Sequence, residues 1–211
     1  MPATLADVER VVHDMSETIV ANEQYFGDLD AVVGDGDFGY SMARGFELVL
    51  EGWDTFDRAD IATFLKRVAV VITSRVGGTS GPIWGTGFLR AASVAAGAET
   101  IGGADVVAML RSSVDGIKAR GKAELGEKTL LDALVPMIDA IEKEVAVEAT
   151  ARDTVRAAAV AAREAAEGTR SLRAMRGRAS YSGERSIGTL DAGAVAVAVI
   201  LEALADQWPV A

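Results

Sequence analysis

The sequence predicts an all-α fold, because apolar residues recur at helical spacing in eight segments and no segment shows the strict alternation of a half-buried strand. Glycine or proline stands at segment ends, as at Pro82 and Gly121, where helices commonly begin or stop. The chain has 211 residues, of which 50% are hydrophobic, so it can bury a sizeable core. We therefore expect residues 1–211 to form one domain, or at most a tight pair, built as a helical bundle or barrel.

The expected helices follow one another with short connections. They lie at 5–19, 42–49, about 58–76, about 83–97, 107–117, 131–145, about 151–168 and about 191–206. Gly121 and Gly168 end the fifth and seventh, and the eighth is apolar on nearly every side, which predicts deep burial. Residues 169–190 lack the pattern and carry five arginines, so we expect a lid or binding loop suited to phosphate oxygens.

Composition narrows the class of protein. A formal net charge of −10 and an isoelectric point near 4.7 argue against nucleic acid or an anionic membrane as the main partner. The absence of cysteine excludes disulfides and thiolate sites. Charged residues interrupt the N-terminal apolar residues, so we expect no signal peptide, no membrane span and a cytoplasmic location.

The strongest chemical signal is a glycine-hinged turn that carries Asp30, Asp35 and Asp37 directly before a helix. Carboxylates held about 4 Å apart repel by roughly 1 to 4 kcal/mol per pair, and a divalent cation removes that cost. Oxygen ligands without Cys or His favour Mg²⁺, Mn²⁺ or Ca²⁺, and Mg²⁺ commonly completes its shell with phosphate. An ordinary turn with a helix cap is the alternative. A calcium loop is excluded, because Phe46 stands where its closing Glu is needed.

Three other patterns suggest phosphate binding less strongly. Residues 34–39 fit a dinucleotide fingerprint, but the segment after them is helical, so no βαβ unit forms. Residues 121–129 nearly spell a P-loop but insert Glu127 and follow a helix, which leaves only Lys128 and Thr129 before a helix start. Residues 77–82 place small residues at another helix start, where free amides bind anions.

Four stretches, taken together, closely resemble the nucleotide-binding L subunit of dihydroxyacetone kinases. They are 34–37 with Asp30 upstream, 77–82, 126–134 and 177–193, in the family's order. The last stretch is the most specific, and it separates the chain from the related nucleotide domain of fatty acid kinases. The resemblance runs essentially end to end and implies an eight-helix antiparallel barrel with the nucleotide at one end.

The resemblance also implies roles for single residues. Asp30, Asp35 and Asp37 match ligands of two Mg²⁺ ions that bridge the phosphates of ADP or ATP, and Arg178 matches a catalytic position. The implied nucleotide contacts are Phe38, Gly39, Tyr40, Ser41, Thr79, Ser80, Gly121, Leu130, Arg178, Asp191, Ala192 and Gly193. Family members commonly carry His where Phe38 stands, so a phosphate or ribose contact of that His would be missing here.

The implied activity is transfer of a phosphoryl group from Mg²⁺-bound nucleotide to a small hydroxyketone. In this family a histidine of the substrate-binding subunit holds the ketone, whereas the single histidine here, His13, lies inside the first predicted helix, so we expect a separate partner subunit. The donor is either free ATP or a phosphohistidine carrier of the phosphotransferase system that recharges bound ADP, and the ketone is dihydroxyacetone or a sugar such as erythrulose. A homodimer is also expected.

Two other functions remain to be weighed. One is a regulatory or interaction protein that keeps the nucleotide as a ligand without kinase turnover. The other, a dinucleotide-dependent oxidoreductase, requires strands.

Overall fold

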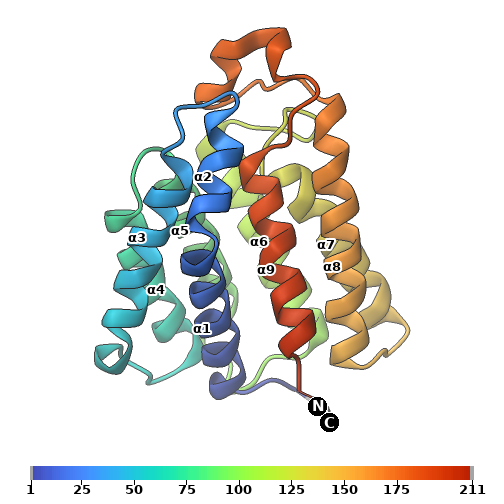
Figure 1. Cartoon of the computed structure of the whole chain (residues 1–211). Helices are drawn as coiled ribbons and strands as arrows, with labels where there is room; N and C mark the ends of the chain where they lie inside the picture. Colours follow the sequence, from blue (N-terminus) through green and yellow to red (C-terminus); the bar gives the residue numbers. More distant parts are fainter. Residues whose placement is uncertain (1, 210–211) are drawn as a thin grey trace. The chain divides into compact units, whose positions relative to one another are not determined.

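The computed structural model describes residues 2–209 and contains, within them, nine α-helices and three 3₁₀ helices but no strand (Figure 1). The α-helices are α1 (Leu5–Ala21), α2 (Glu23–Ala31), α3 (Phe38–Glu51), α4 (Ile61–Arg75), α5 (Ser80–Val94), α6 (Gly103–Gly121), α7 (Leu131–Ala146), α8 (Ala151–Gly168) and α9 (Ala192–Gln207). The 3₁₀ helices are η1 (Trp53–Thr55), η2 (Thr169–Ser171) and η3 (Arg178–Ser186). The predicted all-α class is confirmed, and it excludes a strand-based dinucleotide site.

The chain divides into two compact units, and each consists of two separate stretches. The first comprises Met1–Ala21 and Ser41–Gly121, and the second Asn22–Tyr40 and Lys122–Ala211. The divisions fall at Asn22, where the backbone leaves the helical conformation between α1 and α2 (φ −106°, ψ 18°), within α3, and at the end of α6. That residues 1–211 form one domain stays a prediction.

The first unit is held together by helix packing and an aromatic cluster. Helix α5 packs against both α4 and α6. The ring of Trp53 in η1 lies 5.5 Å from that of Phe64 in α4 and 6.3 Å from that of Phe56. The guanidinium of Arg58 lies 5.5 Å from the centre of the Trp53 ring and pairs with Glu9 of α1 at 2.6 Å. These contacts join α1, η1 and α4 around one apolar centre.

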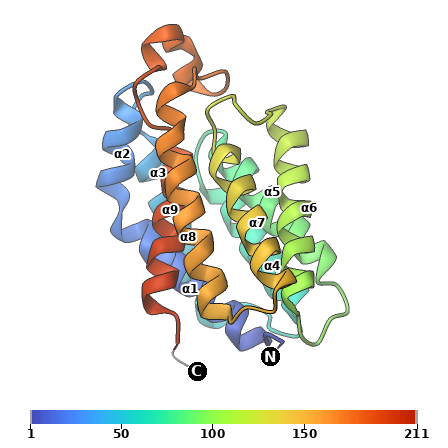
Figure 2. The same cartoon turned by 90° about the vertical axis from the view of Figure 1, so that its right-hand side faces the viewer.

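The second unit is a layer of helices with α9 at its centre. Helices α7, α8 and α9 pack against one another, and α2 packs against α9 (Figure 2). The buried residues of α9 are Ala194, Val195, Ala196, Val197, Ala198, Ile200 and Leu204. The predicted deep burial of this helix is therefore confirmed. A two-pronged ion pair between Arg163 of α8 and Glu202 of α9, at 2.7 and 2.6 Å, fastens the two helices where their polar edges meet.

The structure corrects two expectations about secondary structure. Helix α2 was not predicted, because it has nine residues and Phe26 is its one buried side chain, too few for an apolar period to emerge. Residues 169–190 are not a plain loop, since η2 and η3 occupy most of them. The only buried residue of η3 is Ser186, so apolar spacing could not reveal it. Within residues 2–209, no helix has both the length and the apolar run needed to cross a bilayer.

Candidate functional site

The acidic turn is folded around the side chain and carbonyl of Asp30, in the last turn of α2. The Asp30 carbonyl accepts a hydrogen bond from the Gly34 N–H at 2.6 Å, and its carboxylate accepts one from the Gly36 N–H at 2.8 Å. Gly36 has a φ of +76°, a conformation that glycine adopts without steric cost. As a result, carboxylate oxygens of Asp30, Asp35 and Asp37 lie within 4.8 Å of one another, as the spacing predicted.

Close approach of α2 and α3 explains two of the residues around this turn. A β-carbon on Gly39 would overlap the backbone of Glu23 and Gly27, so the first turn of α3 lies directly on α2. Phe38, at the start of α3, sets its ring 6.2 Å from that of buried Phe26. The Phe that replaces the family's usual His therefore extends the apolar contact between the two helices.

Arg178 of η3 is placed against the acidic turn. Its guanidinium contacts the Asp35 carboxylate and lies 3.4 Å from that of Asp37. The Ser182 hydroxyl donates to the Val33 carbonyl at 3.0 Å, which fixes η3 to the turn. Exposed ion pairs contribute only about 0 to 1 kcal/mol, less than the repulsion among three crowded carboxylates. The turn therefore still favours an additional cation.

The donor set fits a hard divalent cation. All three side chains offer carboxylate oxygen, and Asp35 and Asp37 are exposed, which leaves room for water and a phosphate ligand. The other such group among residues 2–209 is His13, Asp14 and Glu17 on α1. There the His13 ring lies against Trp53, with ring centres 5.0 Å apart, and Arg10 is 4.0 Å from Asp14, so these groups already have protein partners.

The start of α9 forms a second part of the site in the same unit. Asp191 caps the helix by accepting from the Ala194 N–H at 2.7 Å, and a β-carbon on Gly193 would lie 3.3 Å from that of Leu130. Burial raises the pKa of Asp191 to about 7; the charges of Asp132 and Asp30 raise it further, while its backbone hydrogen bond and Lys128 act against this. The charge of Asp30 is the smallest of these influences on Asp191.

Of the remaining predicted residues, Tyr40 is exposed in the second unit, whereas Ser41, Thr79, Ser80 and Gly121 belong to the first. A β-carbon on Gly77 would lie 2.8 Å from the Ser41 hydroxyl, so the glycine-rich turn approaches α3 there. Thr79 is exposed at the start of α5 and its side chain makes no capping bond, so the first amides of α5, beginning at Ser80, are open to an anion. Gly121 ends α6, and the described contacts do not place it beside Ser41 or Thr79.

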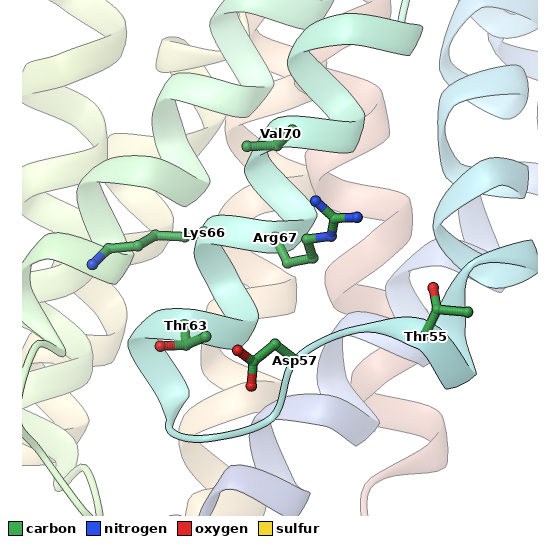
Figure 3. A pocket seen from close by; sticks show the side chains of 6 residues that line it. All are labelled: Thr55, Asp57, Thr63, Lys66, Arg67 and Val70. Atoms are coloured by element: carbon green, nitrogen blue, oxygen red, sulfur yellow. The ribbon is translucent and has the colours of Figure 1, made fainter.

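A surface hollow of ≈ 450 Å³ lies elsewhere on the first unit (Figure 3). It is lined by Thr55, Asp57, Thr63, Lys66, Arg67 and Val70. Figure 3 shows Lys66 and Arg67 extending in different directions, so the two cations do not converge on a common ligand position. None of the predicted site residues lines this hollow.

Two residues that help to shape the site were not singled out from the sequence. Ser182 ties η3 to the acidic turn, and nothing in its local sequence indicates so distant a partner. The Asp132 carboxylate accepts from the Gly126 N–H at 2.5 Å and the Thr129 N–H at 2.8 Å, and so orders the turn before α7. Here a signal was present, because Thr129-x-x-Asp132 has the spacing of a capping box.

The fold and the acidic turn define the class: an all-α protein with a candidate cation and phosphate site. Residues 32–206 match the family described as the DAK2 domain. The ADP-binding subunit DhaL of PEP-dependent dihydroxyacetone kinase 1 from Listeria innocua is 37% identical over 195 residues, 92% of each chain. The DhaL subunit of the Escherichia coli PEP-dependent enzyme is 38% identical over 182 residues, 86% of this chain and 87% of that one. The chain belongs to the DAK2 domain family, and within it to the DhaL type.

A solved structure has the same fold. The crystal structure of the dihydroxyacetone kinase from C. freundii in complex with AMP-PNP and Mg²⁺ matches with a TM-score of 0.75 and 26% sequence identity. The match covers 98% of this chain but 35% of that one, so this chain corresponds to about a third of the larger kinase.

Proposed function

We propose that this chain is the nucleotide-binding, phosphoryl-transferring subunit of a dihydroxyacetone-type kinase. It binds ADP or ATP with Mg²⁺ and passes a phosphoryl group to a small hydroxyketone held by a separate substrate-binding subunit. The observation that carries the proposal is the convergence of three carboxylates within 4.8 Å, with Arg178 beside them. Membership of the DAK2 family and the nucleotide named for the relatives support it.

In this proposal Asp30, Asp35 and Asp37 hold Mg²⁺, which when bound screens the negative charge of the phosphates. Mg²⁺ usually takes only one or two carboxylates, so three of them suit two ions rather than one. The guanidinium of Arg178 binds the oxygens of the transferred group, since its planar fork matches them and its charge offsets the charge that develops there. Phosphoryl transfer needs little beyond such positioning and charge, so no protein nucleophile is required.

Helix starts provide the other contacts in this proposal. The free N–H groups at the start of α3, from Phe38 to Ser41, and of α5, at Thr79 and Ser80, bind phosphate oxygens. Leu130, Gly121 and the start of α9, from Asp191 to Gly193, complete the nucleotide pocket. The close contact of Leu130 with Gly193 supports a narrow pocket wall that a larger side chain would disrupt.

The ketone is bound by the partner subunit in this proposal. His13 is the single histidine of the chain, and its ring is stacked edge-on against Trp53 within the first unit, where it supports packing. We further propose that the donor is a phosphocarrier subunit that recharges bound ADP, since two relatives of nearly equal length are described as PEP-dependent and ADP-binding. Self-association into a homodimer stays a prediction, which sedimentation of the purified chain measures.

Replacement of a proposed metal ligand tests the site. Asp35→Asn keeps the shape of the side chain but removes the charge that a cation requires. Since losing even an outer partner of a metal ligand costs about 10–100-fold in affinity, we expect Mg²⁺-nucleotide binding to weaken by more than about 100-fold. Isothermal titration with Mg²⁺ and ADP measures this. Asp28→Asn, on α2 two residues before Asp30 but outside the cluster, is the control and should bind as the unchanged protein does.

Reconstitution separates the kinase from the regulatory alternative. The purified chain, a substrate-binding subunit, Mg²⁺ and dihydroxyacetone should yield the phosphorylated ketone when ATP or the carrier system is supplied. Stable nucleotide binding without any transfer would favour a regulatory protein instead. Mass spectrometry of nucleotide released on denaturation then identifies the donor: stoichiometric ADP after gel filtration indicates recharging, and its absence indicates free ATP.

A further inference from the structure

Lys128 is a buried lysine whose side chain is surrounded by backbone carbonyls of a distant segment. Only 3% of its surface is exposed. Its Nζ donates to the carbonyls of Thr169 at 2.9 Å, Ser186 at 2.7 Å and Thr189 at 2.6 Å, and it lies 3.3 Å from that of Leu172. An ammonium group has three N–H donors, so all of them are used and the Leu172 carbonyl shares one.

The four carbonyls belong to the two ends of one segment. Thr169 and Leu172 lie in and just after η2, whereas Ser186 and Thr189 lie at the end of η3 and just before α9. Between these ends the chain runs out beyond the ends of α8 and α9 and then returns, as the orange segment in Figure 1 shows. This part of the chain carries Arg178. The Lys128 ammonium therefore joins the two ends of segment 169–189, together with direct bonds from the Gly188 N–H to the Arg170 carbonyl at 2.7 Å and from the Ala174 N–H to the Ser186 hydroxyl at 2.9 Å.

The backbone around Lys128 is bent to direct its side chain inward. Lys128 has a φ of +61°, in the left-handed region that a residue with a β-carbon rarely occupies, and it follows Gly126 at +85°. Such a conformation costs free energy, and here hydrogen bonds to buried carbonyls offset that cost. The neighbouring Glu127 acts in the same direction: its carbonyl accepts from the Met175 N–H at 3.0 Å and its carboxylate binds Arg176 at 2.7 and 2.8 Å.

The chemistry of this cage differs from that of a phosphate ligand. Burial lowers the pKa of Lys128, the charge of Arg170 lowers it further, and Asp191 acts in the opposite direction. With every N–H directed at a carbonyl, the ammonium has no donor left for a nucleotide. Residues 121–129 therefore resemble a P-loop in sequence only, because the Lys128 side chain is directed at backbone carbonyls instead of a phosphate.

We propose that Lys128 is a positioning residue: its ammonium acts as an internal clasp that holds segment 169–189 closed and thereby keeps Arg178 on the acidic turn. The clasp itself depends only on the contacts above. Its effect on nucleotide binding rests on the proposed function, because Arg178 matters there only if the acidic turn holds a nucleotide.

Hydrogen exchange read by mass spectrometry tests the clasp on the full-length chain without nucleotide. Lys128→Ala removes the ammonium that joins the carbonyls of Thr169 and Leu172 to those of Ser186 and Thr189. We therefore expect residues 169–189 to exchange roughly tenfold faster or more, while residues 151–168 of α8 are unchanged. The matched control is Lys122→Ala, because Lys122 is exposed and also has a positive φ of 49°. Unchanged exchange of 169–189 in Lys128→Ala would overturn the proposal.

Chemical rescue distinguishes a charged clasp from simple filling of space. Propylammonium should restore slow exchange of residues 169–189 in Lys128→Ala, whereas n-propanol, of similar size but uncharged, should not. If the variant is unfolded, the clasp is supported when propylammonium restores folding and n-propanol does not. The clasp is overturned when the two compounds act equally or when neither has an effect. Binding of Mg²⁺ and ADP is then measured: weaker binding that propylammonium restores supports the effect on Arg178. If residues 169–189 exchange faster in Lys128→Ala but the unchanged protein binds no nucleotide, the clasp is upheld and the proposed function is refuted.

Discussion

Replacement of Gly39 by alanine tests the contact that builds the acidic turn. A β-carbon at this position would come too close to the Glu23 carbonyl oxygen and would lie 2.5 Å from the Gly27 nitrogen. Both are backbone atoms of α2, so no side chain can swing aside and the two helices must separate. Asp30 lies in the last turn of α2, so the same movement would disturb the acidic turn.

The size of the effect follows from two opposing contributions. Overpacking of a tight contact costs about 1–3 kcal/mol, whereas alanine gains up to about 1 kcal/mol over glycine inside a helix. The gain is small in the first turn, so we expect Gly39→Ala to lower the free energy of unfolding by about 1–2 kcal/mol. For a chain of this size, that corresponds to a fall in Tm of roughly 2–8 °C.

Thermal unfolding followed by circular dichroism, without Mg²⁺ or nucleotide, measures the change. Gly168→Ala is the matched control, because Gly168 ends α8 with helical angles (φ −58°, ψ −25°) and has nothing within 4 Å of a β-carbon. The same substitution should therefore raise Tm at Gly168 and lower it at Gly39. If Gly39→Ala were as stable as the unchanged protein, the tight packing of α3 on α2 would be wrong.

Two further predictions concern helix caps. Burial raises the pKa of Asp191 to about 7 from an ordinary 3.8, so between these values the folded chain holds a proton that the unfolded chain has lost, and stability falls as pH rises. In urea unfolding at pH 4.5 and 7.5, Asp191→Asn should reduce this fall, by at most about 3 kcal/mol. An equal fall in both proteins would contradict the assignment. Asp60 accepts from the Thr63 N–H at 2.7 Å at the start of α4, so Asp60→Ala should cost about 1 kcal/mol in the same assay. Asp60→Asn, which keeps an acceptor, should be nearly neutral; a similar loss in both would show that the cap bond is not the cause.

The parts of the fold and site that were predictable are those with a local signal. Apolar residues spaced three or four positions apart predicted the long helices. The charge density of residues 30–37 predicted that Asp30, Asp35 and Asp37 converge. Helix α2 was not predicted, because a single buried side chain produces no helical spacing of apolar residues. The roles of these carboxylates as metal ligands, and of Arg178 as a catalytic group, stay predictions.

The parts that were not predictable depend on partners far away in the chain. Lys128 looks like a phosphate ligand in its local sequence, yet its carbonyl partners lie 41 to 61 residues further on. The division into two units was equally hidden, because one of its borders lies inside α3, where the helix continues without a break. Local patterns report helices well, but they cannot report which carbonyls a buried cation will meet.

The second unit has a consequence for how the chain matures during synthesis. Its early stretch, Asn22–Tyr40, is made long before Lys122–Ala211, and the bond between Ser182 and Val33 spans 149 residues. Contacts so distant along the chain form late, since the intervening polypeptide must first be closed into a loop. The three aspartates therefore leave the ribosome with only the local bonds of Asp30, and chains truncated before η3 should lack the contacts of Arg178 and Ser182 with the acidic turn.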